Sequence, residues 1–237
     1  MIILKAKKQR RLLNNLFNMS IAQNLLKIKS TLPEQLTLVA VSKTKPVADL
    51  MEAYEAGQRI FGENKIQEMA EKWEQMPKDI QWHMIGHVQT NKVKFMAQFV
   101  SLIHGVDSLK LLQEINKQAQ KNNRVIDCLL QIHIAEEETK FGLDEKELAS
   151  LLSSNEFQEM KNIRIVGLMG MATFTENKNQ IKKEFLHLKS IFVGLQLRKD
   201  ALLCASTLSM GMSGDYQLAI ECGSTMVRIG SSIFGGR

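Results

Sequence analysis

The chain has 237 residues, 44% of them hydrophobic and 24% charged, which is typical of a globular protein and excludes a fibrous or low-complexity chain. No run of about 18 apolar residues occurs, so the sequence predicts no membrane-spanning helix. Residues 1–18 hold five basic side chains and no acidic one, so the net charge of +6 leaves only +1 for the other 219 residues. We therefore expect no nucleic-acid partner for this nearly neutral body.

The basic segment 1–18 allows three interpretations. It fits an arm that binds nucleic acid or anionic lipid, a transit segment poor in serine, or a start placed upstream of the true first residue. We favour the third, because Met19 opens a segment with the pattern of a first helix. We interpret 1–18 as a disordered extension and 19–237 as one domain. The three cysteines form no CxxC motif, which favours reduced thiols in a cytoplasmic protein.

From residue 19 onward, helical and extended patterns alternate along the chain. After a first helix at about 20–30, the predicted strands are 36–42, 59–62, 81–86, 100–106, 124–134, 163–171, 207–212 and 226–230. The predicted helices that follow them are 46–56, 64–76, 89–98, 108–121, 144–152, 176–197 and 215–222, with a short last helix. Mostly apolar strands suit a parallel sheet covered on both faces. Eight such units predict a single (β/α)8 TIM-type barrel; a doubly wound sheet is the alternative with the same alternation.

Small polar residues follow the last two predicted strands, where a barrel of this kind often binds phosphate. Gly230, Ser231 and Ser232 come directly after strand eight and are expected to open a short helix, whose free N–H groups attract anions. Ser209 and Ser213 lie at the end of strand seven and offer hydroxyl donors. The alternative is that these residues only form turns and a helix cap.

Lys43 lies one residue beyond the apolar run that ends at Val41, at the predicted mouth of strand one. Burial at such a place lowers a lysine pKa and lets the amine form a Schiff base with an aldehyde. The alternative is a solvated lysine at a strand end, and Lys45 competes for any role. A reactive lysine together with a phosphate site suggests a phosphorylated aldehyde, of which pyridoxal 5′-phosphate (PLP) is the common one.

Several motifs at the strand mouths resemble those of the PLP homeostasis proteins. They are LVAVSKTKP at 38–46, FGEN at 61–64, WHMIGHVQTNK at 82–92, GLMGM at 167–171, LSMGMS at 208–213 and GSTMVRIG at 223–230. The resemblance covers about residues 19–237 and implies a PLP-binding barrel similar to the N-terminal domain of alanine racemase. Departures from the family pattern are Lys65, where many members have Tyr, and the stretch 214–216, which is less acidic here.

The resemblance also implies roles for individual residues. Lys43 matches the lysine that forms the Schiff base, and Arg228 matches the arginine at the pyridine nitrogen. The residues that match the phosphate-binding positions are Ser209, Gly230 and Ser231, and those that match pocket-lining positions are Asn64 and Met169.

The expected function is intracellular PLP homeostasis, with PLP held on Lys43 and no robust catalysis. An arginine at the ring nitrogen makes the ring a poorer electron sink, and we expect no added domain to supply a second acid or base. The implied partners are PLP and apo forms of PLP-dependent enzymes, and we expect a monomer. The alternatives are an amino-acid racemase or lyase of low activity and a phosphate-binding isomerase without PLP. No metal is expected, because Gly86 breaks the spacing of His83 and His87.

Overall fold

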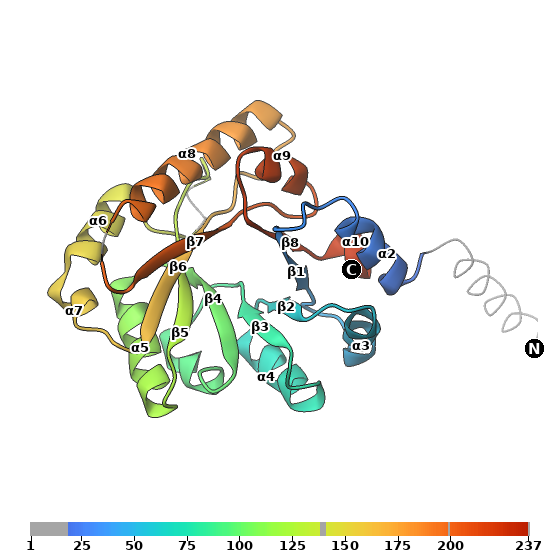
Figure 1. Ribbon diagram of the computed structural model, residues 1–237, viewed down its shortest axis with the longest axis horizontal. Coiled ribbons are helices and arrows are strands. Elements are labelled where there is room, and N and C mark those ends of the chain that lie inside the picture. The colour runs from blue at the N-terminus through green and yellow to red at the C-terminus, as the bar shows by residue number, and fades with distance from the viewer. Residues whose placement is uncertain (1–18, 138–140, 199, 237) are drawn as a thin grey trace, which may run out of the picture.

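Eight parallel strands close into a barrel in which each strand pairs with the next along the chain and β8 pairs with β1 (Figure 1). The computed structural model describes residues 19–137, 141–198 and 200–236. The strands are β1 Thr37–Val41, β2 Ile60–Glu63, β3 Gln81–Met84, β4 Val100–Val106, β5 Ile126–Gln131, β6 Ile163–Met169, β7 Leu203–Ser209 and β8 Met226–Ile229. The predicted (β/α)8 barrel is confirmed.

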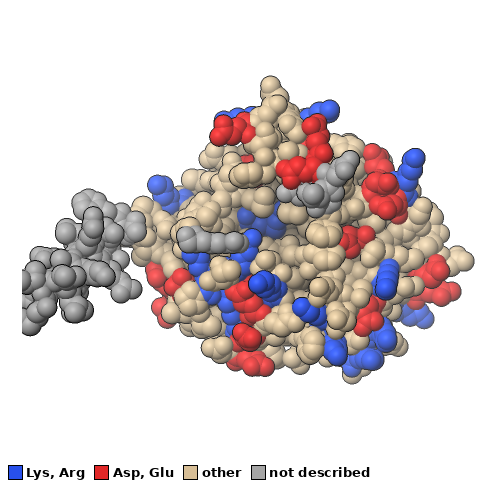
Figure 2. Space-filling model, turned by 180° about the vertical axis from the view of Figure 1, so that it is seen from behind, with Lys and Arg blue, Asp and Glu red and all other residues tan. Residues whose placement is uncertain are grey.

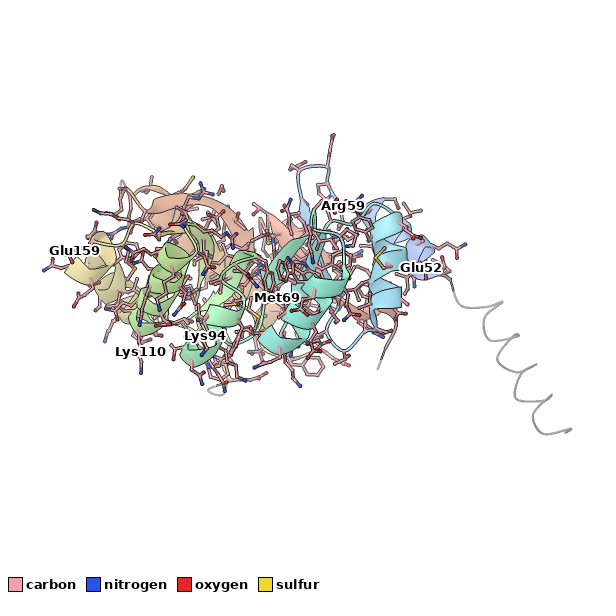
Figure 3. The ribbon with its side chains drawn as sticks, turned by 90° about the horizontal axis from the view of Figure 1, so that it is seen from below. Glu52, Arg59, Met69, Lys94, Lys110 and Glu159 are labelled. Carbon is pink, nitrogen blue, oxygen red and sulfur yellow. The ribbon has the colours of Figure 1, made fainter. Side chains whose placement is uncertain are left out.

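The helices stand around the outside of the barrel (Figure 1). They are α2 Ile21–Lys29, α3 Val47–Glu55, α4 Ile66–Gln75, the 3₁₀ helix η1 Thr90–Phe95, α5 Leu109–Lys121, α6 Glu145–Ser153, α7 Asn155–Gln158, α8 Lys178–Gln196, α9 Tyr216–Glu221 and α10 Ser231–Phe234. Figure 3 shows α3, α4, η1 and α5 following one another along one side of the barrel, marked by Glu52, Met69, Lys94 and Lys110. No helix in the described part of the chain is long and apolar enough to cross a membrane.

Local sequence signals set where some of these helices begin. The Ser20 side chain accepts the N–H of Gln23, and the Gln23 side chain accepts the N–H of Ser20, so α2 starts with a capping box. Asp144 and Glu147 make the same pair of bonds at the start of α6. Because these caps use residues of the helix itself, both starts are specified locally.

The strands bury apolar side chains on both faces. Outward-facing residues such as Leu38 and Ala40 pack with the helices in the large core, whereas Val39 between them belongs to a small inner cluster. That cluster fills the barrel interior and consists of Val39, Leu102, Leu129, Met169 and Met226. Each fully buried side chain of this size stabilises the fold by about 1.5–3 kcal/mol. The barrel is therefore a packed core, and only its ends are open to ligands.

The structure corrects the position of the seventh strand, which the sequence predicts at 207–212 and which lies at Leu203–Ser209. Its first half exposes small polar side chains such as Cys204 and Ser206, so it carries no apolar signal. The chain turns away after Met210 because Gly211 has a φ of +96°. The strand thus ends at Ser209, and the residues after it belong to the loop at the barrel mouth.

Smaller corrections concern the fifth unit and the third helix. Strand β5 ends at Gln131 rather than at residue 134; Ile132 still donates its N–H to Met169 at the end of β6, but its bridge partner is Leu143. The segment predicted as a helix at 89–98 is a 3₁₀ helix, and α7 is a short helix that the sequence did not predict.

Candidate cofactor site

A cavity of about 580 Å³ opens at the end of the barrel where the strands finish. Figure 2 looks onto this face, where basic side chains lie in and beside a hollow. Five of the seven residues predicted for the site line the cavity; they are Lys43, Asn64, Arg228, Gly230 and Ser231. They come from the segments that follow β1, β2 and β8 and from β8 itself. Residues far apart in the sequence therefore meet at one site, as expected for the mouth of a barrel.

Two lysines line the cavity, but their amines have different surroundings. The Nζ of Lys45 donates to the carbonyl oxygens of Phe234 and Gly236, both at 3.0 Å. The Nζ of Lys43 makes no hydrogen bond or ion pair with any residue that the structure describes. Lys43 is therefore the lysine whose amine is free to react, whereas Lys45 fastens the C-terminal segment.

Asn64 supplies an unused acceptor at the cavity. Its Oδ1 is buried and has no hydrogen-bond partner among the described residues. A buried polar atom without a partner costs free energy, on the order of 1–3 kcal/mol. A ligand that donates a hydrogen bond to this oxygen would remove that cost, which fits a polar cofactor lying beside Asn64.

Gly230 and Ser231 line the cavity together with Ser213. A Cβ at Gly230 would lie 3.0 Å from the carbonyl oxygen of Val41, so β8 passes close to the end of β1 here. The first N–H groups of α10, which starts at Ser231, have no acceptor within the helix. Amide donors and the hydroxyls of Ser213 and Ser231 can together bind an anionic group such as a phosphate.

Arg228 forms the buried floor of the cavity and is 3% exposed. Its Nη1 donates to the carbonyl oxygen and to the Oγ of Ser209, at 2.9 and 2.7 Å, and its Nη2 donates to the carbonyl oxygen of Gly170. Burial lowers the pKa of Arg228 to about 10, although nearby Asp215 opposes the shift. The guanidinium is therefore still protonated at neutral pH and acts only as a donor.

A chain of buried polar groups continues from Arg228 into the barrel. The Ser209 Oγ lies 3.2 Å from the Nδ1 of His104, and the Nε2 of His104 lies 3.0 Å from the Nδ1 of His83. Burial lowers the pKa of His83 to about 3 and that of His104 far below its ordinary range, where His83 and Arg228 add to the effect. Both imidazoles are therefore neutral at physiological pH, and the chain of hydrogen bonds carries no extra charge.

Two of the residues that the resemblance assigns to the site are not part of the cavity lining. Ser209 is fully buried behind Arg228, and Met169 belongs to the apolar cluster inside the barrel. Met171 and Ser213 line the cavity near them. The direct contacts assigned to Ser209 and Met169 stay predictions.

Several residues that line the rim of the cavity were not predicted from the sequence. His87 stacks on Phe141 with ring centroids 4.1 Å apart and contacts Asp107 at 3.1 Å. Gln131 donates to the carbonyl oxygen of Phe141 at 2.7 Å, which ties Phe141 to the end of β5. Gln131 is the polar residue at the end of β5 and could have been predicted from that position. The contact with Phe141 depends on the path of the loop, which the sequence does not show.

Residues 19–237 match the family model of the alanine racemase N-terminal domain, which defines the class of barrel to which this site belongs. A pyridoxal phosphate homeostasis protein of Aquifex aeolicus is 40% identical over 201 residues, which cover 84% of this chain and 86% of the relative. The corresponding protein of Pasteurella multocida is 38% identical, over 92% of this chain and 98% of the relative. The chain belongs to the family of pyridoxal phosphate homeostasis proteins.

A solved structure of PipY from Synechococcus elongatus, described as having PLP bound, matches this structure with a TM-score of 0.82 and 34% identity. The match covers 91% of this chain and all of PipY. The resemblance noted in the sequence is thereby confirmed at the level of family and fold.

Proposed function

We propose that this protein binds PLP in the cavity at the barrel mouth and serves PLP homeostasis, with Lys43 as the covalent attachment point. The observation that carries this is the difference between the two lysines: Lys43 has a free amine in the cavity, whereas Lys45 is bound to two carbonyl oxygens. PLP bound to PipY and the names of the curated relatives support the choice of ligand.

The residues that line the cavity fit both the phosphate and the ring of PLP. Ser213, Ser231 and the amides at the start of α10 would hold the phosphate, and Asn64 would accept a hydrogen bond through its unpartnered Oδ1. When bound, the cofactor supplies an aldehyde that condenses with amines and an electron-withdrawing ring.

Arg228 has a distinct part in this proposal. Because its guanidinium is buried and protonated, it would donate a hydrogen bond to the pyridine nitrogen and disfavour protonation there. Ser209 and Gly170 hold both of its terminal nitrogens, so the donor cannot swing away. An unprotonated ring nitrogen weakens the ring as an electron sink, which favours holding the cofactor over catalytic turnover.

Delivery of PLP to apo-enzymes is the second part of the proposal. The rim of the cavity carries Phe174, which is 93% exposed, and Phe141, which is 53% exposed. An open mouth with apolar side chains beside it would let acceptor proteins and free amines approach the bound cofactor. We propose that the chain does this as a monomer in the cytoplasm, with residues 19–237 as the working domain.

The test is to reduce the PLP-loaded protein with borohydride and map the modified residue by mass spectrometry. Lys43→Ala is expected to lose the covalent adduct and its visible absorbance while the circular dichroism spectrum is retained. A PLP label on Lys45 would contradict the assignment. The loaded protein is also incubated with each common L- and D-amino acid; a turnover number near the enzyme median of about 10 s⁻¹ would favour the racemase or lyase alternative.

A further inference from the structure

A buried cluster of charges lies directly behind the segment that carries Lys43. Lys72 on α4 is 5% exposed and Glu63 at the end of β2 is fully buried. The Nζ of Lys72 donates to Glu63 Oε1 and Glu68 Oε1, both at 2.7 Å, and to the carbonyl oxygen of Ser42 at 2.8 Å. An ammonium group has three N–H donors, so every donor of Lys72 is used.

The cluster holds the backbone on both sides of Lys43. On one side, Lys72 donates to the Ser42 carbonyl, and the Ser42 Oγ donates to Glu63 at 2.6 Å. On the other side, Glu68 Oε1 accepts the N–H of Thr44 at 2.6 Å. Lys43 is thus the residue between two anchored peptide groups, and both anchors lead to Lys72.

Thr44 needs such an anchor because its backbone is in an unfavourable conformation. Its φ is +64°, a region in which β-branched residues are rare because the side chain collides with the backbone. Lys72 and the Thr44 amide hold the pKa of Glu68 below its ordinary value although burial opposes this, so its carboxylate stays charged as an acceptor. Burial raises the pKa of Glu63 against the opposing effects of Lys72 and Ser42.

We propose that Lys72, Glu63 and Glu68 are positioning residues that keep Thr44 in its left-handed conformation and thereby hold the amine of Lys43 in the cavity. The inference rests on the proposed function, since it assigns the cluster a role toward the lysine that takes the cofactor. A buried ion pair adds little net stability over apolar packing, so stability alone does not account for three charges at this place. None of the three lines the cavity, and they act through the backbone of the Lys43 segment.

The test uses Glu68→Met, which removes the acceptor of the Thr44 N–H and keeps the length of the side chain. In this variant the rate of covalent PLP attachment to Lys43 is expected to fall about tenfold, the size expected when a non-glycine residue is released from the left-handed region. Hydrogen exchange at the Thr44 amide is expected to become faster in the cofactor-free chain. Glu71→Met, an exposed neighbour on the same helix, is the matched control and is expected to behave like the wild type.

Two further variants separate positioning from simple structural support. Glycine adopts positive φ without strain, so Thr44→Gly combined with Glu68→Met is expected to restore the attachment rate to within about twofold. Glu68→Gln keeps an oxygen for the Thr44 N–H and is expected to attach PLP at nearly the wild-type rate. If Glu68→Met does not fold, Glu68→Gln still tests the proposal, because a tenfold fall of the attachment rate in this variant would overturn it.

The outcomes distinguish the two proposals. An unchanged attachment rate in a folded Glu68→Met chain, or no rescue by Thr44→Gly, would overturn the positioning role. A wild-type chain that takes up no PLP would instead overturn the proposed function. In that case the hydrogen-exchange measurement on the cofactor-free chain still decides whether Glu68 holds Thr44.

Discussion

Arg228 and Ser209 form a fixed pair at the floor of the cavity, because one nitrogen of the guanidinium donates to both the hydroxyl and the carbonyl oxygen of the serine. Arg228 and Ser209 lie on neighbouring strands, β8 and β7, so the pair also joins the two strands across the barrel interior. The Ser209 hydroxyl, in contact with His104 as well, has little capacity left for a ligand.

The first prediction concerns this pair. Ser209→Ala removes a buried hydrogen bond to a charged group, worth about 1.5–3 kcal/mol, and frees Arg228 to shift. We expect the affinity for PLP to fall about tenfold, equivalent to ~1.4 kcal/mol, while the affinity for inorganic phosphate is unchanged. Isothermal titration calorimetry measures both. An equal loss for the two ligands would show that Ser209 contacts the phosphate directly, as the resemblance implies.

The second prediction separates the two lysines of the cavity. Lys45→Met loses the bonds to Phe234 and Gly236 and is expected to lower the free energy of unfolding by about 1 kcal/mol, as measured by urea denaturation. Covalent attachment of PLP is expected to continue, because Lys43 is untouched. Lys94→Met, a change of the same charge on the exposed side of η1, is the control and should leave stability nearly unchanged. Loss of attachment in Lys45→Met alone would reassign the reactive lysine.

The third prediction is a pH dependence of stability that arises from the buried histidines. The unfolded chain protonates His83 near pH 6.5, whereas the folded chain does so only near its pKa of about 3. His83 therefore contributes stability that is fully present above about pH 6.5 and is lost as the pH falls toward 3, with a slope of ~1.4 kcal/mol per pH unit. His83→Gln should make the fall between pH 6 and pH 4.5 shallower by about this amount. Equal slopes in urea titrations of both chains would mean that His83 is already protonated in the fold.

The fourth prediction concerns residues 1–18, which lie outside the described residues. A chain that starts at Met19 is expected to keep its melting temperature within about 2 °C and to take up the same amount of PLP. The first helix is held by residues beyond this point: the Ala22 N–H donates to Glu52, and the Asn24 side chain donates to the carbonyl of Ile233. Differential scanning fluorimetry and the absorbance of bound PLP check both expectations. A fall of more than about 5 °C would assign the segment a structural role.

The order of the strands could be predicted because strands buried on both faces contain mostly apolar runs, such as Leu-Val-Ala-Val in β1 and Cys-Leu-Leu in β5. β7 is an exception: Cys204 and Ser206 in its first half are exposed, so hydropathy places the strand too late. The same displacement puts Ser209 at the end of the strand, where it bonds to Arg228, and not inside it as the predicted strand 207–212 implies.

The site residues that could be predicted are those whose role follows from their own position in the sequence. Lys43 and Gly230 lie within two residues of a strand end, and a strand end can be predicted from the sequence. The burial of Lys72 with Glu63 and Glu68 could not be predicted, because a lysine and two glutamates on or near a helix are normally solvated. Only the packing of α4 against β2 reveals that these charges are buried together.

The short pairing between β7 and β8 has a consequence for the lifetime of the protein. β7 and β8 share a single registered position, Ser209 with Met226, whereas β5 and β6 share six. The cavity residues Ser213 and Gly230 follow β7 and β8 respectively. A ligand that contacts both therefore links the two neighbouring strands that share the fewest paired residues. Binding at a hundredfold excess over Kd adds about 2.7 kcal/mol to the free energy of unfolding by linkage. A loaded chain would therefore resist proteolysis longer than an empty one, and the amount of this protein in a cell would follow the supply of its ligand.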